Sequence, residues 1–379
     1  MSNFLLNYGM LLLLHVALFV FGAIVGSFIN VWVARLPYEK SILWPLGSRC
    51  GQCYAVIRWY DNIPLLSYWL LRGRCRHCQA EFSIRYFLIE LIVALGFPVI
   101  FYVEVIQNIH DFNAFQNTLQ HLRYGLFARE NIPAYLFFSH RAILFSLLVA
   151  AAGCDLNRRT IPLQLTMIGT LIGLLYGISF PWPWPNGIAV SLPRPRAGID
   201  DWWSLQPNEM QRSGLYPWPV WGPLPSWIPP GSWQLGLATS LAGAIAGTAL
   251  LRSVKFLFER GLGREALGLG DADLMMMAGA FLGWQVVVMS FLAGGVITLL
   301  ISLPSLFRRD EQELPFGPGL AAGCITTWVG WELIAPHIQV LFFHPTFLTL
   351  FALGCGGVIL VMSFLFGTLR GTATSGTES

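Results

Sequence analysis

The fold is decided by an uninterrupted apolar stretch near the N-terminus. Residues 10–34 read MLLLLHVALFVFGAIVGSFINVWVA and contain no charged side chain. A helix needs about 20 apolar residues to cross the hydrocarbon core of a bilayer, so this stretch is long enough to span it. It has no basic segment or clear small-residue cleavage site, and its apolar run is too long for a signal peptide. We therefore expect residues 1–34 to hold a retained first transmembrane segment.

Eight more apolar stretches follow, and the composition of the whole chain agrees with them. Of the 379 residues, 55% are hydrophobic and only 11% are charged, whereas globular proteins carry about 25% charged residues. This composition excludes a soluble globular fold, a disordered chain, collagen and a small disulfide scaffold. The net charge of +3 is too small to indicate a nucleic acid partner. The nine predicted spans are residues 10–34, 86–107, 134–154, 162–180, 235–257, 273–283, 285–303, 318–336 and 344–367.

The sequence therefore predicts an all-α polytopic membrane protein with about eight or nine transmembrane segments. Lys and Arg residues gather in the cytoplasmic loops of membrane proteins. With the N-terminus outside, the inner loops hold 17 of the 23 Lys and Arg residues, and eight of these lie in residues 35–85. A break between two helices near Gly283 keeps Arg308 and Arg309 on the inner side as well. We expect that break and the cytoplasmic location of the basic insert at 35–85.

A long loop interrupts the membrane domain that we expect over residues 86–367. Residues 181–234 hold eight of the 15 Trp and twelve of the 23 Pro, and so much proline excludes a long helix there. We expect an outer loop whose indoles rest at the level of the lipid headgroups, with a lid or a partner-binding surface as the alternative. The Ser-, Thr- and Gly-rich residues 368–379 predict a disordered tail.

Four cysteines mark the basic insert at 35–85. Cys50 and Cys53 form one Cys-x-x-Cys pair, Cys75 and Cys78 form a second, and 21 residues separate the pairs. Each pair can present two thiolates to one tetrahedral ion, and a reducing cytoplasm disfavours disulfides. We therefore expect a small cytoplasmic domain with a structural Zn²⁺ site, with two redox pairs or idle thiols as the alternatives. The other cysteines are expected to be small core residues, and they are Cys154, Cys324 and Cys355.

Acidic side chains are costly inside a bilayer, so those at its boundary are candidates for function. Asp155 ends the third predicted span, and Asp271 follows the Gly-Leu-Gly at 268–270 at the start of the sixth. Both lie on the cytoplasmic side of the predicted topology. Two carboxyl groups within hydrogen-bonding distance share one proton, so that one activates water as a general base while the other polarises a carbonyl. This is the chemistry of an aspartyl protease. The alternative is a structural role for each aspartate. Asp271 would then cap its helix, and Asp155 would form an ion pair with Arg158 or Arg159.

At this point the sequence resembles the type IV prepilin peptidases, the bifunctional leader peptidases and N-methyltransferases of bacterial type IV pilus and type II secretion systems. The similarity covers most of the chain and surrounds both cysteine pairs and both aspartates. The residues that carry it are 26–31, 35–37, 61–67, 72–76, 83–86, 90, 155, 161–162, 265, 268–271, 314–318 and 320–321.

The resemblance implies a membrane-embedded endopeptidase in which Asp155 and Asp271 form the catalytic pair. It also implies a substrate, the leader of a type IV prepilin or type II secretion pseudopilin, cut after a glycine at the cytoplasmic face of the bacterial inner membrane. S-adenosylmethionine would then methylate the exposed amino group. The chain departs from the family at Asp273, where the family usually has Lys. Only one of Asp271 and Asp273 can face Asp155, because residues two apart on a helix point about 200° from each other.

The methyl donor is implied by the resemblance alone. No residue is assigned to bind it, because no Gly-x-Gly-x-x-Gly loop lies between a strand and a helix. The insert, with Asp61, Asn62 and Glu90 nearby, is the expected location. Its basic charge suits anionic lipid, or an acidic residue near the mature N-terminus of the substrate, better than it suits a basic leader.

Two other functions compete with this interpretation. One is a Gly-x-Gly-Asp intramembrane protease with non-pilin substrates, a class that lacks the four-cysteine insert. The other is a non-enzymatic zinc-bearing scaffold or transporter, and a transporter would more often show paired repeats with broken helices.

Overall fold

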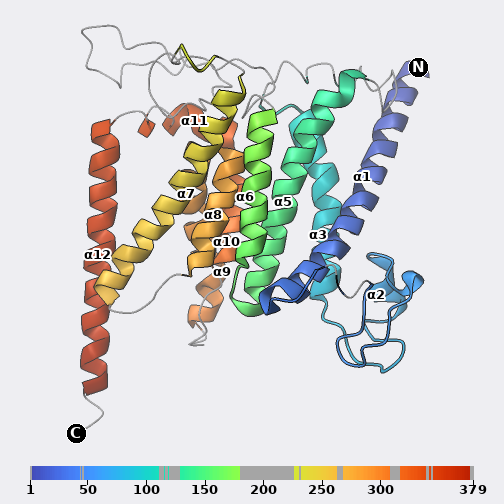
Figure 1. Ribbon diagram of the computed structural model, residues 1–379, viewed down its shortest axis with the longest axis horizontal. Helices are drawn as coiled ribbons and strands as arrows, with labels where there is room; N and C mark the ends of the chain where they lie inside the picture. The colour runs from blue at the N-terminus through green and yellow to red at the C-terminus, as the bar shows by residue number, and fades with distance from the viewer. Residues whose placement is uncertain are drawn as a thin grey trace. The chain divides into compact units, whose positions relative to one another are not determined.

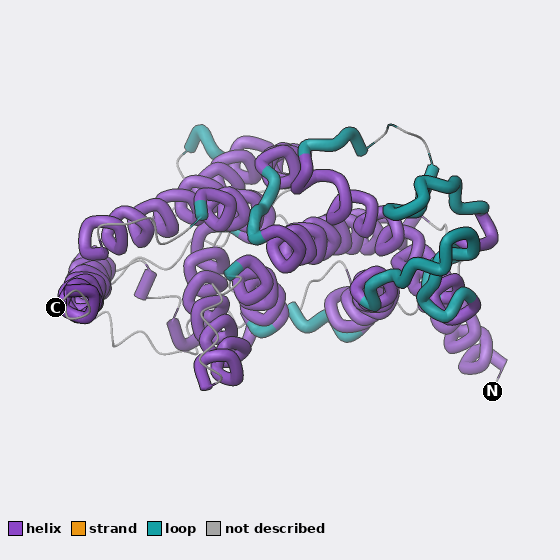
Figure 2. Tube along the Cα trace, turned by 90° about the horizontal axis from the view of Figure 1, so that it is seen from below, coloured by secondary structure: helices purple, strands orange, loops and turns teal. Residues whose placement is uncertain are grey.

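The computed structural model describes most of the chain as helices. The described residues are 2–42, 44, 47–110, 115, 118, 129–179, 226–229, 232–262, 268–307, 316–338, 341–342 and 345–375. Within them no strand longer than an isolated bridge occurs, so the all-α prediction is confirmed (Figures 1 and 2). The chain divides into two compact units, Met1–Leu165 and Thr166–Ser379. Residues 180–225, which include most of the predicted outer loop, lie outside the described residues.

The first unit contains three long helices that pack against one another and an insert between the first two of them. Its described elements are α1 (Ser2–Arg35), η1 (Leu36–Tyr38), η2 (Trp59–Asp61), α2 (Leu66–Leu70), α3 (Arg85–Ile100), the π-helical η3 (Phe101–Ile106), η6 (Arg129–Asn131) and α5 (Ile132–Arg158). Glycines bring α1 and α3 into close contact. A Cβ atom on Gly22 would lie 2.6 Å from the carbonyl oxygen of Val93, and one on Gly26 would lie 2.7 Å from the Cα of Glu90. Larger side chains would separate these two helices.

The second unit is built around a pair of helices in backbone contact. Its described helices are α7 (Trp233–Leu262), α8 (Leu269–Leu282), α9 (Trp284–Phe307), α10 (Gly317–Val329), α11 (Trp331–Ile338) and α12 (Pro345–Ser375), and α6 (Leu163–Ser179) begins just before its boundary. A Cβ atom on Gly243 of α7 would lie 2.0 Å from the carbonyl oxygen of Gly279 on α8, and the reverse distance is 2.1 Å. Ten of the 14 residues of α8 are buried, so this helix forms the core of the unit.

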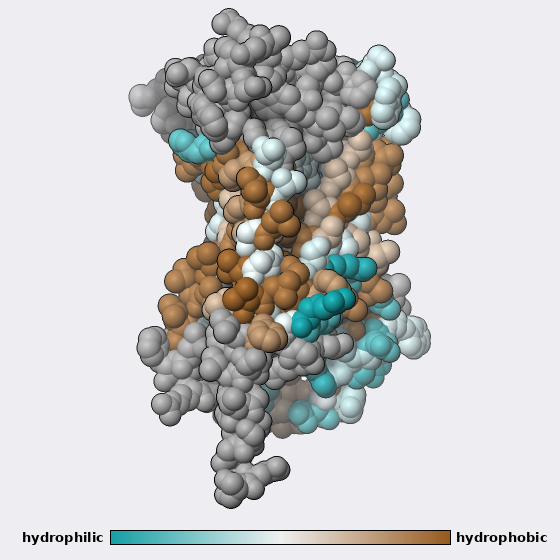
Figure 3. Space-filling model, turned by 90° about the vertical axis from the view of Figure 1, so that its left-hand side faces the viewer, coloured by the Kyte–Doolittle hydropathy of each residue, from teal (hydrophilic) through white to brown (hydrophobic). Residues whose placement is uncertain are grey.

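The surface of the helices has the character expected for contact with lipid. On α3, the side chains of Leu88, Ile92, Leu95 and Val99 follow a helical spacing and are 42–56% exposed. Figure 3 shows hydrophobic side chains across the middle of one face, with more hydrophilic side chains above and below them. Among the described residues, six helices are long and apolar enough to cross a membrane. Their spans are Gly9–Tyr38, Arg85–Ile106, Ile132–Arg158, Trp233–Gly261, Trp284–Leu303 and Thr346–Phe364.

All nine predicted spans fall on helices, with one correction. The predicted break near Gly283 is confirmed, since α8 ends at Leu282 and α9 begins at Trp284. Gly283 adopts a positive φ of 81°, a conformation that glycine reaches easily because it has no side chain. The eighth span, predicted as one helix over 318–336, is two helices separated at Gly330. Glycine weakens a helix, and the hydropathy of the surrounding residues does not report that weakness.

Two predictions about the C-terminal region are wrong. The tail was expected to be disordered from residue 368, but α12 continues to Ser375. Extending a helix that a long apolar segment has already nucleated adds one hydrogen bond per residue, so weak helix formers can follow it. Cys355 was expected in the core, but it is exposed on α12, because hydropathy alone does not distinguish a buried face from a lipid-facing one. Cys154 and Cys324 are buried as predicted.

Candidate functional site

The two cysteine pairs lie on loops with the same backbone hydrogen bonds. In the first loop, the N–H of Cys50 donates to the carbonyl of Ala55 at 3.0 Å. In the second, the N–H of Cys75 donates to the carbonyl of Ala80 at 2.9 Å. An isolated antiparallel bridge closes each loop. The residue after each pair adopts a left-handed conformation, and these residues are Tyr54 (φ 56°) and Gln79 (φ 58°).

These matching loops bring the four sulfur atoms together. The Sγ atoms of Cys50 and Cys78 are 3.7 Å apart, those of Cys53 and Cys75 are 4.0 Å apart, and all four lie within 4.8 Å of one another. Four sulfurs around Zn²⁺ at about 2.3 Å would be separated by about 3.8 Å. The four cysteines that the sequence singled out therefore fit one tetrahedral metal ion.

The thiols also favour a cation electrostatically. The backbone N–H of Cys53 lowers the pKa of Cys50 to about 6, which makes one thiolate accessible near neutral pH. The backbone N–H of Ala80 lowers the pKa of Cys78, but burial and hydrogen bonds to the other three thiols outweigh it and raise that pKa to about 11. The cluster thus resists carrying several negative charges by itself. A bound cation removes this conflict, because metal ligation stabilises every thiolate.

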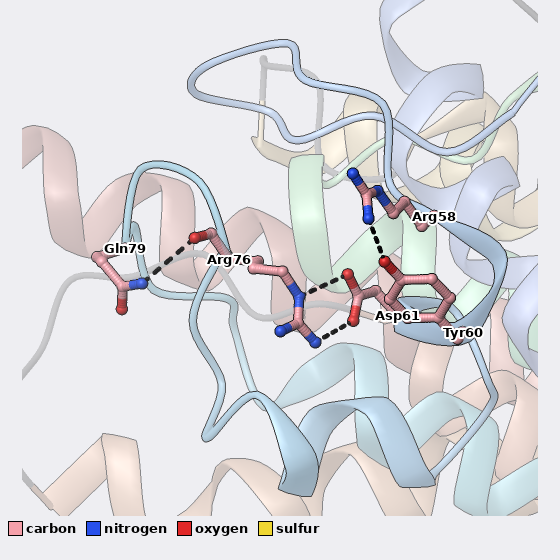
Figure 4. Close-up of polar contacts among 5 residues, drawn as sticks. All are labelled: Arg58, Tyr60, Asp61, Arg76 and Gln79. Atoms are coloured by element: carbon pink, nitrogen blue, oxygen red, sulfur yellow. Dashed lines mark hydrogen bonds and ion pairs between the residues drawn. The ribbon is translucent and has the colours of Figure 1, made fainter.

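An ion pair connects the loop of the second cysteine pair, here called the second metal loop because it belongs to the candidate metal site, to the linker between the cysteine pairs. Arg76 lies inside the second pair, and its Nε and Nη2 donate to the two carboxylate oxygens of Asp61 at 2.9 and 2.6 Å (Figure 4). These hydrogen bonds hold the pKa of Asp61 below its usual value. The guanidinium groups of Arg58 and Arg76 lie 5.8 and 5.9 Å from the ring of Tyr60, within cation–π range. Asp61 therefore holds the linker against the metal loop.

A second carboxylate ties the insert to the long helices. Glu90 on α3 accepts hydrogen bonds from the N–H of Leu65 at 2.7 Å and from the side-chain amide of Asn30 on α1 at 3.4 Å. Leu65 has φ 63° and ψ −45°, and the N–H of Leu66 donates to the carbonyl of Pro64 at 2.7 Å. This is a γ-turn of the rare strained form, so the clamp by Glu90 holds a costly backbone conformation. Since this carboxylate and that of Asp61 already accept hydrogen bonds from the protein, we place no cofactor contact on either.

Asp155 lies on the last turn of α5 and is 6% exposed. The side-chain amide of Asn157 donates to the carbonyl of Val33 on α1 at 3.4 Å. The guanidinium of Arg158 lies 4.1 Å from the centroid of the Tyr38 ring, in η1. These contacts place Asp155 at the end of the first unit that carries the insert.

Asp271 lies in the first turn of α8 and is 9% exposed. The preceding Gly268 is extended, with φ −69° and ψ 145°. A carboxylate in a first helical turn is favoured by the helix dipole. Asp273 is partly exposed, so Asp271 is the more enclosed of the two. Asp155 and Asp271 belong to different units, and the proposed pairing of their carboxyl groups stays a prediction.

A buried pair of opposite charges inside the first unit was not singled out from the sequence. The Nε of Arg141 on α5 donates to a carboxylate oxygen of Glu104 at 3.1 Å, and the two side chains are 2% and 1% exposed. Glu104 lies in the π-helical turn η3. The signal was available, because an acid and an arginine in neighbouring apolar segments are expected to pair. This pair belongs to the interior of the helices.

Two family models match separate parts of this chain. The model described as the Bacterial Peptidase A24 N-terminal domain matches residues 20–104, and the model described as the Type IV leader peptidase family matches residues 227–303. The first match contains the four cysteines and the second contains Asp271. Asp155 lies between the two matched regions.

Known relatives extend this similarity over most of the chain. The "Prepilin leader peptidase/N-methyltransferase" of Myxococcus xanthus (strain DK1622) is 32% identical over 83% of this chain and 72% of its own length. The protein of the same name from Pseudomonas putida is 27% identical over 86% of this chain and 93% of its own. That from Pectobacterium carotovorum subsp. carotovorum is 29% identical over 81% and 90%. No solved structure matches the chain.

Proposed function

This chain belongs to the prepilin leader peptidase/N-methyltransferase family, and we propose from this membership that it removes the leader of a prepilin and methylates the new N-terminus. The observation that carries the proposal is the similarity to the Myxococcus xanthus relative, which spans 83% of this chain. The match to the Type IV leader peptidase family includes the Gly-Leu-Gly before Asp271. The four-cysteine insert also argues against the other Gly-x-Gly-Asp intramembrane proteases.

Peptide hydrolysis is assigned to Asp155 and Asp271 acting together. Both are carboxylic acids enclosed by protein, at 6% and 9% exposure. Two such acids brought together share one proton, because like charges in a poorly solvated site disfavour each other. The ionised carboxylate takes a proton from water, whose oxygen attacks the scissile carbonyl carbon. The protonated carboxyl polarises the carbonyl oxygen, and the amide nitrogen leaves after receiving a proton.

The proposed substrates are type IV prepilins, and type II secretion pseudopilins fit the same chemistry. A prepilin has an apolar helix that can approach laterally through the bilayer while its leader stays in water. The six spans described here provide the membrane setting for this encounter. We place the cut at the cytoplasmic face of the bacterial inner membrane, because Lys and Arg gather in the loops that flank Asp155 and Asp271.

The insert is proposed to hold a structural Zn²⁺ ion. Its four ligands would be Cys50, Cys53, Cys75 and Cys78, whose sulfur separations suit a tetrahedral ion. Four thiolates fill the coordination sphere, so the ion would stabilise the insert and have no open position for a substrate.

N-methylation requires a donor of the methyl group, which we propose to be S-adenosylmethionine.

Co-expression with a type IV prepilin tests both activities. The host should lack its own prepilin peptidase, and the mass of the intact pilin should be measured. We expect the mass of the chain without its leader plus one methyl group. Uncut prepilin would contradict the peptidase proposal, and cut but unmethylated pilin would contradict the methylation step alone.

A further inference from the structure

The short helix α2 exposes an apolar face that the metal site and the proposed catalytic pair do not use. Leu66, Trp69 and Leu70 are 57%, 66% and 73% exposed. Positions i, i+3 and i+4 lie on one side of a helix, so these three side chains form a single surface, here called the α2 face. Three large hydrophobic side chains exposed together are unfavourable in water and indicate a surface that is covered by a partner.

Ring contacts show at what depth the α2 face lies. Trp69 and Tyr68 pack against Phe87, with ring centroids 5.5 and 5.7 Å apart. Phe87 lies in the first turn of the span Arg85–Ile106. A helix of this length extends about 33 Å, close to the thickness of the hydrocarbon core, so its first turn lies near the headgroup boundary. The α2 face therefore lies at that boundary too.

The position of α2 on α3 is fixed at the start of α2 and by the ring contacts with Phe87. At the start of α2, the N–H of Leu65 is held by Glu90, in the second turn of α3. At its end, the chain turns through Gly73, where φ is 67° and an added Cβ atom would lie 3.2 Å from the ring of Tyr68. The contacts with Glu90 and Phe87 hold α2 beside the first two turns of α3, so the α2 face cannot turn away without breaking them.

The helix against which α2 packs already has exposed side chains that suit lipid. On α3, Leu88 and Ile92 are 42% and 48% exposed next to Phe87. Arg72 lies two residues after the end of α2 and is exposed, as is Arg85 at the start of the span. The insert as a whole has eight Lys and Arg residues against three acidic ones. An exposed face of Trp and Leu with arginines close by in the chain is typical of a segment that lies in the interface of an anionic bilayer.

We propose that the α2 face docks into the interfacial layer of the bilayer beside α3, with Arg72 and Arg85 next to the phosphates of anionic lipids. The surface is thus an anchor that keeps the metal-binding insert at the membrane. The proposal goes beyond the enzymatic function and does not depend on it, since it concerns where the insert lies.

Photo-crosslinking of the full-length protein in vesicles tests this docking. Leu70→p-benzoylphenylalanine places the probe on the α2 face, and Tyr54→p-benzoylphenylalanine is the matched control, since Tyr54 is a 71% exposed residue on the first metal loop. In vesicles of phosphatidylglycerol and phosphatidylcholine, we expect at least about fivefold more lipid adduct at position 70. Equal yields at the two positions would overturn the proposal. So would adducts at position 70 that contain prepilin or a second copy of the chain and no lipid. Bound metal in both variants verifies that the insert is folded.

The role of the arginines is tested in the same vesicles. The ratio of phosphatidylglycerol to phosphatidylcholine adducts at position 70 should exceed the ratio of the two lipids in the vesicle. When Arg72→Gln and Arg85→Gln are introduced into the same protein, the adduct ratio should fall toward the ratio of the two lipids in the vesicle. An adduct ratio equal to the vesicle ratio before these substitutions would contradict the headgroup contact.

Discussion

The insert between α1 and α3 and the helices of the second unit are stabilised in different ways. Among the described residues of the insert, three hydrophobic residues are buried, namely Leu36, Cys50 and Cys75. In α8, by contrast, ten of 14 residues are buried, and its Gly279 meets Gly243 of α7 in direct backbone contact. The insert therefore depends on four thiols and a few polar contacts, whereas the helical unit depends on packing.

This difference predicts how each region responds to substitution. A segment without an apolar core loses its structure when its metal ligands are removed, while a packed helix loses stability in proportion to the clash or buried charge that is introduced. Because the two kinds of support are separate, damage to the insert should leave the helices folded. The predictions below test this separation, from the largest expected effect to the smallest.

The largest effect is expected from Cys75→Ser combined with Cys78→Ser. Structural Zn²⁺ contributes on the order of 10 kcal/mol to the folding of small domains, so the insert should lose its metal and unfold. Metal analysis of the purified protein and limited proteolysis of the insert measure this. The matched control is Cys355→Ser, because Cys355 is exposed on α12, and it should change neither. Metal content that the double substitution leaves unchanged would rule out this ligand set.

A large effect within the helices is expected from Arg141→Met. The change leaves the carboxylate of Glu104 buried without its arginine, and breaking a buried ion pair in this way costs about 3–5 kcal/mol. Thermal unfolding in detergent measures the loss. Glu104→Gln together with Arg141→Met should recover much of it, because neither member of the pair then carries a buried charge. A double variant as unstable as the single one would show that the charge is not the cause.

A smaller effect is expected from Gly279→Ala in α8. The added Cβ atom would lie 2.1 Å from the carbonyl oxygen of Gly243, and overpacking of this kind costs about 1–3 kcal/mol. Gly295→Ala in α9 is the control, since a Cβ atom there meets nothing within 4 Å. Alanine favours a helix over glycine, so the control should be neutral or stabilising. If the two variants unfold at the same temperature, the close contact between α7 and α8 does not contribute to the stability of the protein.

The smallest effect is expected from Asp61→Asn, and it should depend on pH. The hydrogen bonds from Arg76 lower the pKa of Asp61 in the folded insert, so the unfolded chain binds the proton more readily and the ion pair adds stability above about pH 4. That stability is lost as the pH falls through the lowered pKa. The rate of metal release to a chelator should therefore be faster for the variant at neutral pH and approach that of the unaltered protein in acid. Glu81→Gln, which removes an exposed ion pair to Arg74, should show little difference at either pH.

The sequence predicted the helices and the gathering of the four cysteines for clear physical reasons. Long apolar stretches have few alternatives in a bilayer, and two Cys-x-x-Cys pairs have few uses in a reducing compartment. The chain contains a repeat of Arg-Cys-x-x-Cys-x-Ala, at 49–55 and again at 74–80, which the prediction of the insert did not use. The structure shows the two copies as equivalent loops. Recognition of the repeat would have predicted their shared backbone conformation.

Other features depend on contacts between residues far apart in the chain. The buried pairing of Glu104 with Arg141 and the clamp of Glu90 on Leu65 each join two elements, and hydropathy does not report which helix faces which. For the same reason it did not distinguish the exposed Cys355 from the buried Cys324. The pairing of Asp155 with Asp271 also joins distant segments, and it stays a prediction.

That pairing is tested most directly by the rate at which a purified prepilin is cut in detergent. The comparison needs the unaltered protein, Asp155→Asn, Asp271→Asn and the neighbouring control Asp273→Asn. We predict that each of the first two substitutions lowers the rate by about 10³-fold or more, because loss of either carboxyl removes the base or the acid, while the control remains active. Full activity in either Asp155→Asn or Asp271→Asn would contradict the account.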